Sequence, residues 1–309
     1  MPDGARLPAR RWLPAGTPRA VVLALHGFND SRDAWELPAP VMAARGIAVY
    51  APDQRGFGGA PDRGRWAGTD HMVADAAELA RHVRALQPGV PLFLMGESMG
   101  GAVALLVAAR HPELGSSGTV LLAPAVWSRA QMGPLLTASL WAAATFLPDW
   151  HLTGRELPLH VSATDNRAAL YRLAYDPLTV HDTRTATLRG LVDLMTRAQD
   201  EAAHVRGPVL AAYGAHDQLV PPQATASAWQ ALPVGARRAF YPDGYHLLLR
   251  DLGRAAPLDD VTGWMLHPER ALPSGADIAA AAWVASRPWE DTNPLWLPSA
   301  ADGLADTRP

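Results

Sequence analysis

The sequence contains neither cysteine nor lysine among its 309 residues. The absence of cysteine excludes disulfide bonds, thiol nucleophiles and thiolate metal ligands. Because all 27 basic residues are arginine, Schiff-base chemistry, a serine–lysine dyad and a Walker-type phosphate loop are excluded as well. Biased codon usage is the simplest explanation for an arginine-only chain, and the exclusions hold whatever the cause.

Strong net charge and long apolar runs are also missing. The formal charge of −3 provides no electrostatic footprint for a nucleic-acid partner. No apolar run approaches the roughly 20 residues that a bilayer span needs, and the first residues lack the basic-plus-apolar pattern of a signal peptide. We therefore expect a cytoplasmic chain by default, and an exported or anchored one only if an upstream signal has been trimmed. The oligomeric state is left open by the sequence.

Short β-rich apolar runs alternate with longer stretches of helical periodicity along most of the chain. Continuous apolar strands that alternate with helices indicate a mostly parallel sheet with both faces covered, which is an α/β fold. The predicted strands lie within residues 20–27, 46–53, 91–98, 118–125, 208–217 and 236–244.

This alternation stops between residues 126 and 204, where the sequence has helical character and many aromatic side chains. About 80 residues without a strand are too long for a loop of a compact domain. We therefore predict a core of residues 1–125 and 205–286, with 126–204 inserted as a helical cap. The alternative is that these helices simply pack on the sheet. Residues 287–309 form a proline- and tryptophan-rich tail.

Ser98 stands between two glycines in the pattern Gly96-x-Ser98-x-Gly100, where an apolar strand passes into a helical run. A helix cap would explain the serine but not the glycines. Both glycines are needed if Ser98 occupies a sharp strand-to-helix turn, because side chains there would collide with neighbouring backbone. This arrangement is the nucleophile elbow.

A serine nucleophile needs a base, and the base needs a carboxylate that orients it. In sheets of this kind the three groups follow the chain order serine, acid, histidine. Asp217 and His246 supply that order, each just after a predicted strand. Asp243 is the alternative acid, although its surroundings are typical of a turn.

A tetrahedral intermediate also requires hydrogen-bond donors for its oxyanion. The backbone amides of Phe28, in the turn after His26-Gly27, and of Met99, at the start of the helix after Ser98, are the candidates. We expect His26 to hold this loop rather than to take part in catalysis.

The chain resembles the α/β-hydrolase superfamily, and within it the monoacylglycerol lipase/lysophospholipase group. The resemblance covers residues 3 to about 252 and implies a Ser98–Asp217–His246 triad with an oxyanion hole at Phe28 and Met99. The motifs that carry it are "DGARLPARRWLP", "LHGFND", "YAPDQRGFGGA", "MGESMGG", "YGAHDQLVPP" and "GYHLLLRD".

These observations predict a serine hydrolase for monoacylglycerol, lysophospholipid or similar acyl esters, which needs no cofactor or metal. Amide or thioester hydrolysis by the same triad is an alternative, and a ligand-binding module of the same fold is another. We expect the cap to shape the acyl pocket and to make transient contact with a membrane or micelle. The residues expected to line that pocket are Trp127, Leu140, Trp141 and Phe146.

Overall fold

Each of the six predicted apolar runs contains a strand in the computed structural model, which describes residues 1–153 and 161–291. An additional strand, β1 (Ala9–Trp12), pairs antiparallel with β3 at one edge of the sheet. The six predicted strands are β2 (Ala20–Leu25), β3 (Ile47–Pro52), β4 (Leu92–Glu97), β5 (Gly118–Leu122), β8 (Val209–Gly214) and β9 (Arg237–Tyr241). The predicted mostly parallel α/β sheet is confirmed.

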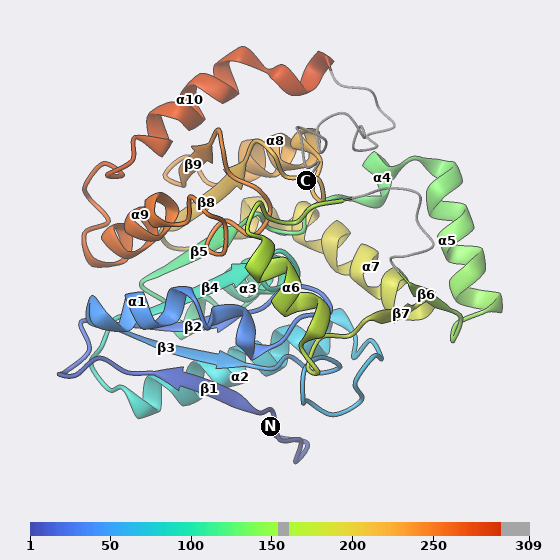
Figure 1. Ribbon diagram of the computed structural model, residues 1–309, viewed down its shortest axis with the longest axis horizontal. Coiled ribbons are helices and arrows are strands. Elements are labelled where there is room, and N and C mark those ends of the chain that lie inside the picture. Colours follow the sequence, from blue (N-terminus) through green and yellow to red (C-terminus); the bar gives the residue numbers. More distant parts are fainter. Residues whose placement is uncertain (154–160, 292–309) are drawn as a thin grey trace, which may run out of the picture.

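The strands form one seven-stranded sheet in the order β1-β3-β2-β4-β5-β8-β9 (Figure 1). All pairs except β1–β3 are parallel, with β4 in register with β2 on one side and β5 on the other. The carboxyl ends of parallel strands lie at one edge of a sheet, which is where open α/β sheets bind ligands. The loops after β4, β8 and β9 therefore open on the same side.

Helices cover both faces of this sheet, because the side chains of a central strand such as β2 alternate between two separate cores. Val21, Leu23 and Leu25 face one core, while Val22 and Ala24 face the other. The main helices are α1 (Pro38–Ala44), α2 (Thr69–Leu86), α3 (Met99–Arg110), α8 (Pro222–Ala231), α9 (Ala255–Leu266) and α10 (Ala276–Ser286). The short 3-10 helices are η1 (Arg32–Trp35), η2 (Pro112–Leu114), η3 (Ala202–His204) and η4 (Pro288–Asp291).

The segment between β5 and β8 is mostly helical but not wholly so. Its elements are α4 (Arg129–Met132), α5 (Pro134–Phe146), β6 (His151–Thr153), α6 (Arg167–Tyr175), β7 (Asp182–Arg184) and α7 (Thr185–Glu201). The antiparallel pair β6–β7 corrects the expectation of helices alone. Strands of three residues are too short to show the alternation by which a strand is recognised in a sequence. Residues 154–160 of the predicted cap and 292–309 of the predicted tail lie outside the described residues.

Helix α7 packs mainly against α3 in the core and α5 in the inserted segment, and it also contacts α2, α4 and α8. Its buried residues Leu194 and Ala198 belong to the same hydrophobic core as α3. Figure 1 shows α4, α5 and α7 together on one side of the molecule. Over the two described stretches of the chain, no helix is both long and apolar enough to cross a bilayer.

Candidate active site

Ser98 occupies a strained turn between the end of β4 and the start of α3. Its φ of 53° and ψ of −116° lie in a region that L-residues rarely adopt, and such strain is typical of functional positions. A Cβ atom on Gly96 would lie 2.1 Å from the Gly100 carbonyl oxygen, and one on Gly100 would lie 2.1 Å from that of Leu25. The collisions that explain these glycines in the sequence are therefore present in the structure.

The expected oxyanion donors are the backbone amides of Phe28 and Met99. Within residues 1–153 and 161–291, neither amide donates a hydrogen bond to another group of the chain. Met99 is the first residue of α3, so its N–H lies at the positive end of the helix dipole. The two amides belong to the segments that follow β2 and β4, which are neighbouring strands.

His26 holds the loop after β2, which carries Phe28 and which we call the oxyanion loop after its expected role. Its Nδ1–H donates to the Gly27 carbonyl at 2.8 Å, and its Nε2 accepts from the Gln54 amide at 3.0 Å. This pattern requires a neutral imidazole with its proton on Nδ1. Burial lowers the pKa of His26, despite the Asp30 and Asp53 carboxylates nearby.

Asp217 and His246 are directly bonded, with 2.8 Å between Asp217 Oδ2 and His246 Nδ1. The other carboxylate oxygen, Oδ1, accepts from the amides of Leu219 and Val220 at 2.8 and 2.9 Å. Both side chains are buried. Asp243, the alternative acid, is exposed in the turn after β9, and within the described part of the chain it makes no hydrogen bond to His246.

Burial alone would lower the pKa of His246, but the Asp217 carboxylate and, more weakly, Glu97 outweigh it, so the pKa lies above its ordinary value. Ser98 and His246 line the same cavity. The described residues contain no hydrogen bond between the Ser98 hydroxyl and this imidazole, and such bonds often tighten only when substrate is bound. The structure therefore joins Asp217 to His246 and places Ser98 on the same cavity as His246.

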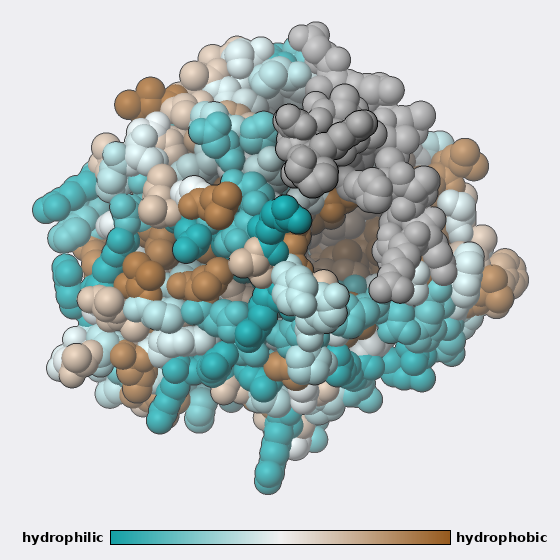
Figure 2. All heavy atoms as spheres, in the orientation of Figure 1, coloured by the Kyte–Doolittle hydropathy of each residue, from teal (hydrophilic) through white to brown (hydrophobic). Residues whose placement is uncertain are grey.

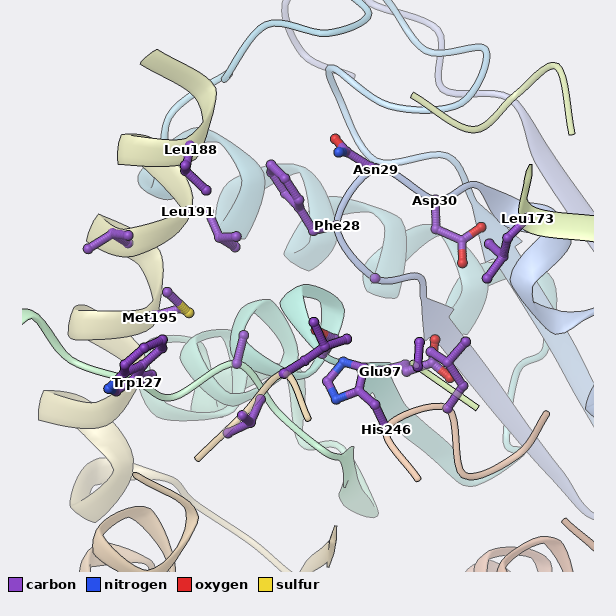
Figure 3. Close-up of a pocket in the computed structure, with 18 of the residues that line it drawn as sticks. Phe28, Asn29, Asp30, Glu97, Trp127, Leu173, Leu188, Leu191, Met195 and His246 are labelled. Carbon is purple, nitrogen blue, oxygen red and sulfur yellow. The ribbon is translucent and has the colours of Figure 1, made fainter. Parts of the chain in front are cut away.

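That cavity has a volume of about 490 Å³ and a largely apolar wall on one side (Figure 3). Of the four residues expected to line the acyl pocket, Trp127 and Leu140 line this cavity. Trp141 and Phe146 do not, and they are 52% and 76% exposed, which corrects our prediction for these two. Both lie on α5, and the helical rotation from Leu140 turns them toward solvent. The apolar wall comprises Trp127, Leu136, Leu140, Leu188, Leu191 and Met195.

A buried charged cluster, which the sequence analysis did not identify, lines the opposite end of the cavity. Arg250 Nη2 donates to Asp30 Oδ2 at 2.8 Å and also bonds Glu97 Oε1. In Figure 3, Asp30 and Glu97 lie on the far side of His246 from Leu191 and Met195. Burial raises the pKa of Glu97, and the neighbouring Arg250 cation partly offsets the effect. The sequence offers one indication of this cluster: Asp30, Glu97 and Arg250 each lie in a motif that also contains an expected site residue.

A serine held in a strained strand-to-helix turn, at the carboxyl edge of a parallel sheet, defines an α/β-hydrolase. Residues 16–253 match the family model described as serine aminopeptidase, S33. The chain belongs to this family.

Curated relatives of similar length include two lipases. The chain is 28% identical to the monoacylglycerol lipase of Mycolicibacterium smegmatis over 272 residues, which are 85% of this chain and 94% of the relative. It is also 28% identical to the monoglyceride lipase of Mus musculus over 281 residues, or 88% and 91% of the two chains.

Among solved structures, a monoacylglycerol lipase of Paleococcus ferrophilus has a TM-score of 0.71 at 21% identity, over 84% of this chain and 98% of that one. A soluble variant of monoglyceride lipase from Saccharomyces cerevisiae, in complex with a substrate analogue, has a TM-score of 0.72 at 19% identity, over 85% and 92%. These similarities establish the fold.

Proposed function

We propose that this protein is a serine carboxylester hydrolase for amphipathic acyl esters of the monoacylglycerol or lysophospholipid type. The observation that carries the proposal is the position of Ser98 and His246 in one cavity, between an apolar wall and a charged end. The lipase relatives support the same conclusion. Each buried acyl methylene contributes about 0.8 kcal/mol, so the apolar wall favours a fatty acyl chain over acetate.

In the proposed mechanism, Ser98 Oγ attacks the ester carbonyl while His246 Nε2 takes its proton. Asp217 holds the imidazole through Nδ1 and stabilises the imidazolium that forms. The amides of Phe28 and Met99 bind the oxyanion, and His246 then donates its proton to the departing alcohol. A water molecule, deprotonated by His246, releases the fatty acid from the acyl-enzyme and regenerates Ser98.

Amide hydrolysis is the second candidate, because the matching family model carries the description of an aminopeptidase. An aminopeptidase needs a carboxylate to bind the substrate's ammonium group. Among the described residues, the carboxylates that line the cavity are Asp30 and Glu97, and both are already paired with Arg250. The charged cluster therefore favours esters over peptides with a free amino terminus.

Residues 126–204 act as the cap in this proposal, and the outer face of α5 supports transient contact with a lipid surface. Leu135 and Phe146 are 84% and 76% exposed there, and apolar patches of this kind mark interaction sites. Figure 2 shows strongly hydrophobic side chains at the edge of the molecule where Figure 1 places α5.

A panel of p-nitrophenyl esters from C2 to C12, with matched anilides and thioesters, tests the reaction type. We expect multiple turnovers on medium-chain esters, and on the order of a 10⁶-fold loss in folded Ser98→Ala. A fluorophosphonate should label the wild type but not this variant. Near-normal hydrolysis by Ser98→Ala would refute the mechanism. Single-turnover acylation alone would instead indicate a ligand-binding module.

A further inference from the structure

Arg250 lies between three segments that carry the proposed catalytic groups. It belongs to the loop after β9, four residues beyond His246. Its guanidinium bonds Glu97, the residue before Ser98, and Asp30, two residues beyond Phe28. All three residues are buried: Arg250 and Asp30 are each 6% exposed, and Glu97 is 2% exposed.

In the part of the chain that the structure describes, Arg250 makes the only polar side-chain contacts between these three segments. Within the described chain, no second hydrogen bond or ion pair joins any two of residues 26–31, 97–99 and 242–252 to each other. The remaining polar contacts of Arg250 involve its backbone. Its amide donates to the Leu247 carbonyl at 2.7 Å, and its carbonyl accepts from Asn166 Nδ2 at 2.8 Å. A side-chain substitution at 250 therefore leaves the backbone contacts available.

Stability is a poor explanation for this cluster. It carries two carboxylates and one guanidinium, so it is formally negative in a buried site. Replacing buried ion pairs by well-packed apolar residues is often neutral or stabilising. A charged cluster beside the nucleophile is better explained by what it does to the geometry of the site.

We propose that Arg250 is a positioning residue, which fixes the nucleophile elbow, the oxyanion loop and the histidine loop relative to one another through Glu97 and Asp30. This inference rests on the proposed function, because it assumes that Ser98, Phe28 and His246 act together. Reacting groups must be held within a fraction of an ångström, and a misplacement of about 1 Å can cost 10²-fold in rate.

The cluster also contributes to the charge around His246. The charged groups that face this imidazole are Asp217 from the loop after β8, Glu97 from β4, and Arg250 from its own loop. Glu97 raises the pKa of His246 and Arg250 lowers it. Loss of the Glu97 charge should therefore move the acid limb of the pH–rate profile in one direction, and loss of the Arg250 charge should move it in the other. A purely structural role would not produce these opposite shifts.

The test compares Arg250→Met, Arg250→Lys and Glu97→Gln in the full chain. Asp75→Asn is the matched control, because Asp75 accepts from Arg55 at 2.8 and 3.0 Å in a buried pair of the core. We expect Arg250→Met to lose roughly 10²-fold in kcat with little change in KM, and Arg250→Lys to recover part of it. The acid limb should move to higher pH in Arg250→Met and to lower pH in Glu97→Gln.

Asp75→Asn should lower the melting temperature without moving kcat or the acid limb. The proposal is wrong if folded Arg250→Met keeps the kcat and acid limb of the wild type, or if Asp75→Asn changes them as much. If Arg250→Met does not fold, Arg250→Lys and Glu97→Gln decide, since both keep a polar partner in place. Ser98→Ala separates the two proposals: an inactive Ser98→Ala with unaffected Arg250 variants refutes the positioning role alone.

Discussion

Asp217 and His246 are joined by a hydrogen bond of 2.8 Å across 29 positions of the sequence. The carboxylate cannot rotate freely, because its other oxygen accepts two backbone amides from the loop that follows. The imidazole is therefore held by Nδ1, and in the proposed mechanism its Nε2 takes the proton from Ser98.

Replacing Asp217 by asparagine should reduce kcat/KM by roughly 10³–10⁴-fold, as expected when the histidine loses the carboxylate that sets its tautomer. Asp243→Asn should stay within about twofold of wild type, because Asp243 is an exposed turn residue. Steady-state kinetics on one soluble ester, with circular dichroism to establish folding, make the comparison. The reverse order of the two variants would assign the acid to Asp243.

In the proposed mechanism, the raised pKa of His246 should set the pH dependence of hydrolysis. A general base acts in its neutral form, so the acid limb of kcat/KM should lie above about 6.5, the ordinary value for histidine. The Asp217 carboxylate is the principal cause of the increase, and the limb in Asp217→Asn should move to lower pH. A pH–rate profile of both proteins checks this, and a wild-type limb below 6 would contradict it.

Features that depend on local chemistry could be predicted from the sequence. Continuous apolar runs are enough to place six of the seven strands of the main sheet. The two glycines around Ser98 are explained by contacts within the elbow and with the adjacent strand. The positions of Asp217 and His246 follow from topology, because the loops after parallel strands lie at one edge of the sheet. Each of these inferences depends only on elements that are adjacent in the fold.

Features that depend on tertiary packing could not be predicted in the same way. Trp141 and Phe146 are large apolar residues, as expected for the wall of a pocket. The rotation of α5 about its axis determines which of its side chains face the cavity. Arg250 lies 153 positions from Glu97, and nothing in the pattern of either motif indicates that they meet. Burial and distant partners determine such a cluster, and a single sequence reports neither.

The elbow glycines should tolerate no side chain. Gly100→Ala would place a Cβ 2.1 Å from the Leu25 carbonyl oxygen, and forcing atoms into a packed site typically costs 1–3 kcal/mol or more. We expect a marked loss of stability and of activity. Gly16→Ala is the control, because no atom lies within 4 Å of its Cβ position. Urea unfolding of both variants measures the difference, and equal stability would mean that the elbow relaxes at little cost.

Polar substitutions on the cavity side of the cap should change the preference for acyl chain length. In Leu140→Ser the increase of kcat/KM from C2 to C12 esters should become shallower, because each methylene loses part of its contribution of about 0.8 kcal/mol. Phe146→Ser should keep the wild-type slope, since Phe146 faces away from the cavity. A flat profile in the wild type, or the same slope in all three proteins, would show that the cap does not form the acyl pocket.

The outer face of α5 should matter only when the substrate is part of a lipid surface. Leu135 and Phe146 expose most of their side chains, and inserting them into an interface removes apolar area from water at about 25 cal/mol per Å². A Leu135→Ser/Phe146→Ser variant should therefore bind phosphatidylcholine vesicles more weakly and hydrolyse a monoacylglycerol held in them more slowly. Its kcat/KM on a monomeric C4 ester should match the wild type, because neither residue lines the cavity.

Leu140→Ser, with the substitution on the inner side of the same helix, is the reciprocal control and should keep vesicle binding. Co-sedimentation with vesicles and the two assays together decide the matter, and equal losses on monomeric and vesicle substrates would show that the outer face acts through folding rather than through lipid contact.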